Sequence, residues 1–311
     1  MARRARHTAL VAAALLVATL SSARDAQANP WTRDAGHFYV NLNYSRISAR
    51  SLFAADGSSL SLRDVDLDGV SERFTQNVLA LYGEVGIISR WLTATVNATL
   101  LRHAKLDLQG STLGLGDITL GFWSGLLTGP IRLSAGIAFG LPTGDPAPTA
   151  DNPTDAGVAA VLPTGDGEFD VEFMLAAGYA FGGRGKTWPL SHYVVGRVGY
   201  HVRTTPREQA FGDPKDFPDA FNWRFEVGTK IPYTFVDRFW LIVRLYGTEI
   251  FSGDAGQNAT GLGPVVFTSY GIEIYGRIVA GLGASFGFNG AFRAKGLPAG
   301  ANLAWSLSYE Y

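Results

Sequence analysis

The sequence has 311 residues, of which only 17% are charged, 12% are aromatic and 38 are glycine, a composition that suits tight turns and lipid-facing strands. Its formal net charge of −1 at pH 7 excludes a nucleic-acid-binding protein, which would need a basic surface. Because no stretch after residue 28 holds about 18 consecutive apolar residues, a helical membrane protein is excluded as well.

The first 28 residues have the pattern of a secretory signal peptide. Three arginines near the start precede an apolar run at 9–20, and Ala26-Gln27-Ala28 is a small-x-small cleavage site. The run is too short to cross a bilayer of about 30 Å as a helix. We therefore expect cleavage after Ala28 and a mature barrel-forming chain at 29–311. The lack of cysteine excludes a lipoprotein anchor and disulfides.

Twelve strands with a period of two follow along the mature chain. The third is the clearest, because its apolar residues alternate with Thr93, Thr95, Asn97 and Thr99. The predicted strands cover 36–48, 75–86, 91–102, 116–124, 131–141, 169–181, 192–203, 220–231, 239–251, 266–276, 280–293 and 301–311.

The connectors between these strands alternate in length. The long ones are 49–74, 103–115, 142–168, 204–219, 252–265 and 294–300. The short ones are 87–90, 125–130, 182–191, 232–238 and 277–279. This alternation, with an even strand number and strands of about 10 to 13 residues, is typical of an outer-membrane barrel that has short periplasmic turns and long external loops. A soluble β-protein is the alternative, but its strands are usually nearer 5 or 6 residues.

Charged residues within the strands fall on one face, and the opposite face is apolar at mid-strand. A charge facing lipid at the midplane would cost about 2–4 kcal/mol, so this segregation favours an antiparallel up-and-down transmembrane barrel over a soluble sheet. The predicted lumen-lining residues are Glu84, Asp117, Arg132, Asp170, Glu172, Arg197, Arg224, Glu226, Lys230, Arg244, Glu273 and Arg293, with Glu310 on the same face of the last strand. They could line a polar conduit, or they could fill the barrel as ion pairs.

The last strand, 301–311, ends the sequence on an aromatic residue. Its larger face consists of Leu303, Trp305, Leu307, Tyr309 and Tyr311. This pattern resembles the closing strand that the barrel-assembly machinery reads as a targeting signal. We expect these side chains to face lipid, and the strand to pair with the first one.

Four short motifs give the sequence a family resemblance. They are LYGEVG at 81–86, GLGD at 114–117, LPTGD at 141–145 and TGDGEFD at 164–170. In order and spacing they resemble a family of outer-membrane transporters known from the meta-pathway of phenol degradation, although Val85 stands where members usually carry tyrosine. The resemblance implies a barrel that moves small, often hydrophobic molecules across the outer membrane. It supplies no binding residues.

Enzymatic and metal-binding interpretations are weaker. A barrel lipase needs a serine activated by a histidine, and none of His37, His103, His192 and His201 has a serine two residues later. The stretch DVDLDG at 64–69 matches the first half of a calcium loop, but position 75 is threonine rather than glutamate. We therefore expect no enzyme, no cofactor and no structural metal, with weak calcium binding at this loop left open.

The sequence predicts a channel in the cell outer membrane for passive uptake of small hydrophobic or aromatic solutes. Its expected partners are outer-membrane lipids, the barrel-assembly machinery and an unidentified small molecule. The alternative is a structural or surface-interaction barrel whose loops at 49–74 and 142–168 contact other molecules.

Overall fold

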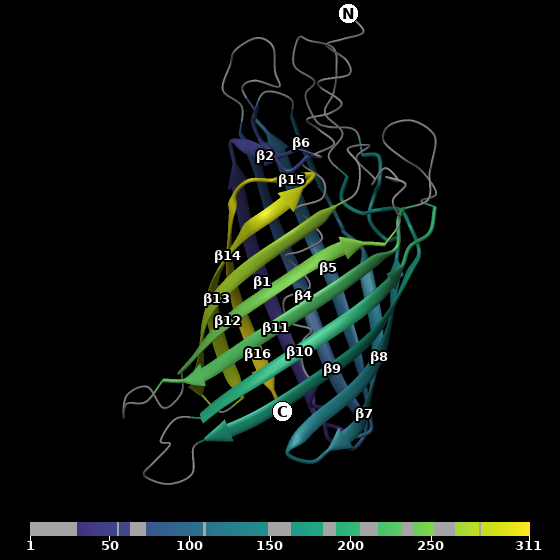
Figure 1. Cartoon of the computed structure of the whole chain (residues 1–311), viewed down its shortest axis with the longest axis vertical. Helices are drawn as coiled ribbons and strands as arrows, with labels where there is room; N and C mark the ends of the chain where they lie inside the picture. Colours follow the sequence, from purple (N-terminus) through teal and green to yellow (C-terminus); the bar gives the residue numbers. More distant parts are fainter. Residues whose placement is uncertain are drawn as a thin grey trace, which may run out of the picture.

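A closed antiparallel β-barrel forms the body of the molecule (Figure 1). The computed structural model describes residues 30–54, 56–62, 73–107, 110–148, 163–182, 191–205, 217–231, 239–251, 265–279 and 281–311. The wall is made by β1 (Phe38–Ala49), β4 (Phe74–Ile88), β5 (Leu92–Leu106), β7 (Ile118–Thr128), β8 (Ile131–Leu141), β9 (Asp170–Gly182), β10 (Ser191–Val202), β11 (Ala220–Lys230), β12 (Phe239–Ile250), β13 (Val266–Val279), β14 (Leu282–Lys295) and β16 (Ala301–Glu310). The last strand, β16, pairs with β1 and closes the ring. The predicted twelve-stranded up-and-down barrel is confirmed.

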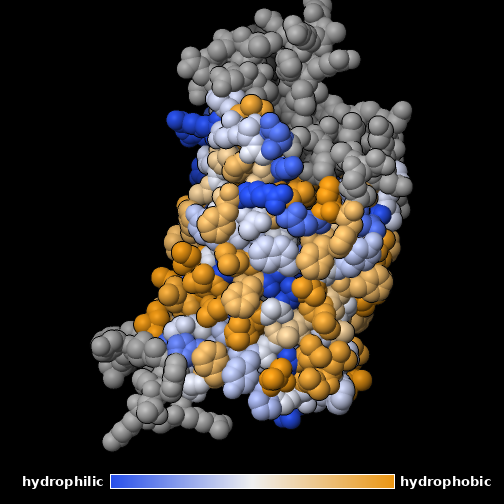
Figure 2. Space-filling model, in the orientation of Figure 1, coloured by the Kyte–Doolittle hydropathy of each residue, from blue (hydrophilic) through white to orange (hydrophobic). Residues whose placement is uncertain are grey.

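The alternation in sequence becomes an inner and an outer face of the wall. In β1, Asn41 and Ser45 are buried, whereas Val40, Leu42 and Tyr44 are each at least 36% exposed. Successive side chains of a strand point to opposite faces, so the exposed apolar set lies outside the barrel. Figure 2 shows hydrophobic side chains spread over the side of the barrel in this way. The wall is therefore inverted relative to a soluble protein, with apolar residues outward.

The ladders of the described strands carry five register shifts, and two of them, in β5 and β14, change the face of a charged residue. In β5, Leu79 pairs with Leu101 and Ala80 with Thr99, which leaves Leu100 without a partner across the ladder. In β14, Phe292 is left over in the same way between Ala291 and Arg293. An extra residue reverses which face every later side chain of that strand occupies. Beyond Leu100 and Phe292, the alternation read from the sequence therefore assigns side chains to the wrong face of the wall.

The long connectors hold more strand than the sequence predicted. In 49–74, β2 (Ser51–Phe53) and β3 (Ser59–Ser61) join β15 (Leu297–Pro298) in a small three-stranded sheet. The expectation that 103–115 is a loop was wrong, because β5 continues to Leu106 and pairs with β6 (Gly110–Gly114). Continued pairing satisfies backbone groups that a loop would leave to water.

The short connectors that the structure describes, 87–90, 125–130 and 277–279, lie at the barrel end that also holds Tyr311 (Figure 1), and we call this the short-turn end. The opposite end is the long-loop end. The expected signal peptide and the acidic stretch at 64–69 lie outside the described residues. No helix in the described part of the chain is long and apolar enough to cross a membrane.

Candidate functional site

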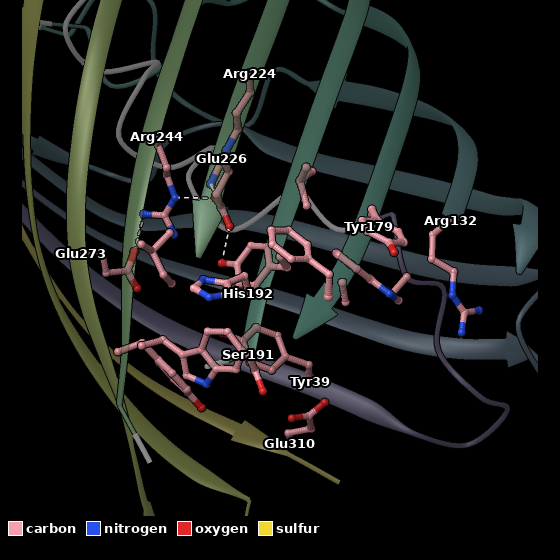
Figure 3. Close-up of a pocket in the computed structure, with 18 of the residues that line it drawn as sticks. Tyr39, Arg132, Tyr179, Ser191, His192, Arg224, Glu226, Arg244, Glu273 and Glu310 are labelled. Carbon is pink, nitrogen blue, oxygen red and sulfur yellow. Dashed lines mark hydrogen bonds and ion pairs between the residues drawn. The ribbon is translucent and has the colours of Figure 1, made fainter. Parts of the chain in front are cut away.

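A cavity of about 1230 Å³ lies inside the barrel near the short-turn end, and we call it the short-turn cavity (Figure 3). Strands from most of the ring contribute to its lining, together with the β7–β8 turn at Gly129 and Pro130. Six of the predicted lumen residues come together here: Glu84, Arg132, Arg224, Glu226, Arg244 and Glu273.

Glu226 is the centre of the charged network in this cavity. Its carboxylate accepts hydrogen bonds from Arg224 and Arg244, each at 2.7 Å, and from the Tyr193 hydroxyl at 2.6 Å. Arg244 also donates to Glu273 (Figure 3). The antiparallel register places Glu226 directly opposite Arg244, and Arg224 lies two residues away on the same face of β11. Buried charges of opposite sign therefore neutralise one another along one wall of the cavity.

Residues 30–37, which we call the N-terminal segment, enter the barrel ahead of β1. The Arg33 guanidinium donates to Glu84 at 2.5 Å and to Glu310 at 3.0 Å. Burial lowers the pKa of Arg33, but the nearby carboxylates of Glu84 and Glu310 outweigh this effect and leave the pKa raised. Arg33 thus remains a cation that fastens the segment to β4 and β16.

The N-terminal segment crosses the lumen. At one side Ala35 donates its backbone N–H to the Ser89 hydroxyl in the β4–β5 turn. At the other side the Trp31 ring meets Tyr193 of β10 edge-on, with centroids 6.1 Å apart, and Tyr193 lies 5.6 Å from Trp240. This crossing narrows the short-turn end and adds an aromatic wall to the cavity.

Replacing Gly178 by valine should displace the N-terminal segment. A Cβ atom at Gly178 would overlap Pro30 and approach Trp31, whereas a Cβ at Gly196 in the neighbouring strand would meet no atom within 4 Å. We expect Gly178→Val to raise single-channel conductance in planar bilayers and Gly196→Val, the control, to leave it unchanged. Equal conductance of the two variants would contradict the placement of the segment.

Residues 163–168, the inner loop segment, are buried at the long-loop end. The Asp117 carboxylate accepts backbone N–H groups from Gly144 at 2.9 Å and from Asp166 at 2.7 Å. Arg102 donates to the Thr164 carbonyl at 2.6 Å, and Arg203 pairs with Glu168 and Asp166. These bonds hold both sides of the 142–168 connector within the barrel. Asp117 therefore binds this connector at the long-loop end and does not line the short-turn cavity.

The remaining predicted lumen residues are dispersed. Glu172 pairs with Arg197 at 3.0 Å, and Asp170 with His201 at 2.7 Å, on the β9–β10 wall. Lys230 lies at the end of β11 opposite Trp240. The prediction that Arg293 lines the lumen was wrong. The bulge at Phe292 turns it outward, where its side chain is 59% exposed and pairs with Glu249 at 3.4 Å.

The aromatic face of the last strand is turned outward. Trp305, Leu307, Tyr309 and Tyr311 are 39–67% exposed, while Ser306 and Ser308 are buried between them. Leu303, on the same face, is half-buried. The strand lies between β1 and β14, so these side chains flank the seam where the barrel closes.

Several residues of the site were missed by sequence reasoning. Arg33 and Trp31 precede the first strand and carry no periodic signal. Arg102 would face outward by parity, but the bulge at Leu100 turns it inward, where it is 3% exposed. The adjacent pair Leu100-Leu101, two apolar residues in an alternating strand, is the signal that could have revealed it. Among the described residues, no group of three or more metal-ligating side chains comes together.

Solved structures of outer-membrane β-barrels are similar to this barrel in fold. The crystal structure of a COG4313 outer membrane channel from Pseudomonas putida F1 aligns with a TM-score of 0.65 and 16% identity, over 91% of this chain and 98% of that one. The β domain of the Bordetella autotransporter BrkA aligns at 0.48 with 14% identity, over 89% and 100% of the two chains. The KdgM porin aligns at 0.42 with 6% identity, over 87% and 99%.

Comparison with sequences gives no match. No protein-family model matches the chain, and no curated protein matches it either. The resemblance to the meta-pathway family therefore rests on the four motifs alone. What the structural likeness establishes is the fold, which is that of an outer-membrane β-barrel.

Proposed function

We propose that this chain is an outer-membrane channel for passive uptake of small solutes with hydrophobic or aromatic character. The observation that carries the proposal is the short-turn cavity of about 1230 Å³, which combines a charged wall with Trp31, Tyr193 and Trp240. Sites for small molecules commonly occupy about 300–1,000 Å³ and combine apolar or aromatic lining with a few placed polar groups. The motifs shared with the meta-pathway transporters, and the fold shared with the Pseudomonas putida channel, add support.

Reconstitution tests this proposal directly. The folded protein should give single-channel conductance in planar bilayers, and liposomes that contain it should take up phenol faster than empty liposomes do. Absence of both conductance and solute uptake would overturn the proposal.

A structural or surface-interaction barrel is the second candidate. It is favoured by the inner loop segment, whose burial and bonds to Arg102 and Arg203 fill part of the lumen at the long-loop end. In that case deletion of the loops at 49–74 and 142–168 should abolish binding to cells or surface ligands, and the intact protein should show neither conductance nor solute uptake. A rise in permeability without any loss of binding would instead support the channel.

A further inference from the structure

One cation of the short-turn cavity lacks a carboxylate. Five arginines line it: Arg33, Arg132, Arg224, Arg244 and Arg277. Four of them pair with the four glutamates of the same lining, the weakest pair being Arg277 with Glu310 at 3.9 Å. Arg132 has no hydrogen bond or ion pair to any described residue, and Figure 3 shows its side chain apart from the Arg224–Glu226–Arg244 network. Among the described residues, the cavity lining therefore holds one positive charge without a counter-charge.

Arg132 and three aromatic residues line the same cavity. Arg132 pairs across the β8–β9 ladder with Gly178. The Trp31 ring lies 3.0 Å from the position that a Cβ atom on Gly178 would occupy. Arg132 and Trp31 both line the cavity, and Tyr193 and Trp240 continue the aromatic wall away from Trp31. The backbone of Arg132 thus lies beside the strand position that Trp31 covers, and the Arg132 side chain lines the same cavity as the three aromatic rings.

These features specify the chemistry of a ligand. A guanidinium presents two parallel N–H donors that match a carboxylate. Aromatic rings favour edge-to-face or offset contact with another ring at centroid distances of about 4.5–7 Å. Because only one cation lacks a described counter-charge, a single negative charge balances the lining and a second would be unmatched.

We propose that the short-turn cavity contains a subsite for an aromatic monocarboxylate, whose carboxylate binds Arg132 and whose ring lies against Trp31 and Tyr193. This inference rests on the proposed channel function and names the substrate class of the same cavity. Arg132 acts as the specificity-determining residue, since it distinguishes an aromatic acid from a neutral aromatic of similar size.

Isothermal titration calorimetry on the folded barrel in detergent tests the subsite, with benzoate, benzyl alcohol and acetate as probes. Benzoate should bind more tightly than either of the others. Arg132→Gln should weaken benzoate binding by about tenfold or more, the loss expected for a charge-assisted hydrogen bond, and should leave benzyl alcohol unaffected. Arg277→Gln is the matched control, since Arg277 lines the cavity but faces Glu310, and it should retain benzoate binding.

The subsite is overturned if benzoate binds no better than benzyl alcohol, or if Arg132→Gln and Arg277→Gln lose benzoate affinity equally. Migration of the unheated protein on gels verifies that each variant is folded. If Arg132→Gln does not fold, Arg132→Lys provides the test, because it keeps the charge but loses the planar fork and should bind benzoate less tightly than the parent. The channel proposal fails separately: benzoate would then bind, but no solute would cross the bilayer.

Discussion

Deletion of Tyr311 should leave little of the protein assembled in the outer membrane. The backbone of Tyr311 closes the seam by accepting from Phe38 at 3.1 Å and donating to Phe38 at 3.0 Å. Its ring stacks on Phe38 with centroids 5.6 Å apart. Two hydrogen bonds and a ring pair together contribute about 3 kcal/mol. We propose that the assembly machinery also reads the exposed aromatic face of β16, which includes Tyr311, so the loss should exceed what stability alone predicts. Immunoblots of outer-membrane fractions measure it.

Tyr311→Phe is the control for this deletion. It keeps the ring and both backbone hydrogen bonds, so its level in the outer membrane should equal that of the parent. Normal levels of the deleted protein would show that the last residue is dispensable for closure and for recognition.

Replacing Glu226 by alanine should destabilise the barrel by about 3–5 kcal/mol, the usual effect of breaking a buried ion pair from one side. Glu226 is 6% exposed and receives hydrogen bonds from two arginines. Its removal leaves the buried guanidinium of Arg224 facing the space that the carboxylate occupied. Urea titration of the protein in lipid vesicles, followed by its migration on unheated gels, measures the change in the free energy of unfolding.

Glu249→Ala is the matched control, because it removes a glutamate–arginine pair from the neighbouring strand on the outer face. The side chains of Glu249 and Arg293 are 41% and 59% exposed, and exposed pairs contribute only about 0–1 kcal/mol. A similar loss of stability in both variants would mean that the network around Glu226 is not held as tightly as its contacts indicate.

The architecture could be predicted because each strand carries its own period-two signal, and lipid requires apolar residues on one face of every strand. β8 was predicted from Ile131 to Leu141, which are its observed bounds. The prediction of strand bounds failed where pairing with a neighbouring strand, rather than the sequence pattern, determines the structure. Polar residues beyond Arg102 read as a loop, yet their backbone pairs with β6. The alternation also predicted the wrong face for Arg102 and Arg293. Each follows a β-bulge, and a bulge is set by pairing with the neighbouring strand rather than by a characteristic residue type.

The candidate site was predictable only in part. Glu226, Arg244 and Glu273 lie at mid-strand, so the alternation of faces was enough to predict that they point inward. Which of these residues contact one another depends on the register between strands and on the path of the N-terminal segment. Neither can be read from the residues next to them in the sequence. Arg33 lies 51 residues from Glu84 and 277 from Glu310, so no spacing rule links them. Arg132 was expected in the lumen, but only the structure shows that the other four arginines pair with glutamates and that Arg132 pairs with no described residue.

The seam between β1 and β16 also constrains how the barrel forms. Tyr39 pairs with Glu310, so this ladder joins the two ends of the described chain, whereas each short-turn hairpin joins neighbours. Loop-closure entropy grows with the logarithm of chain length, which makes this pairing about 3–4 kcal/mol more costly than a hairpin turn. Each hairpin forms through contacts between residues that are close in sequence. The seam forms through contacts between the residues that are farthest apart in the described chain. We therefore expect closure to be the last and slowest event of folding, with the edges of β1 and β16 exposed until then.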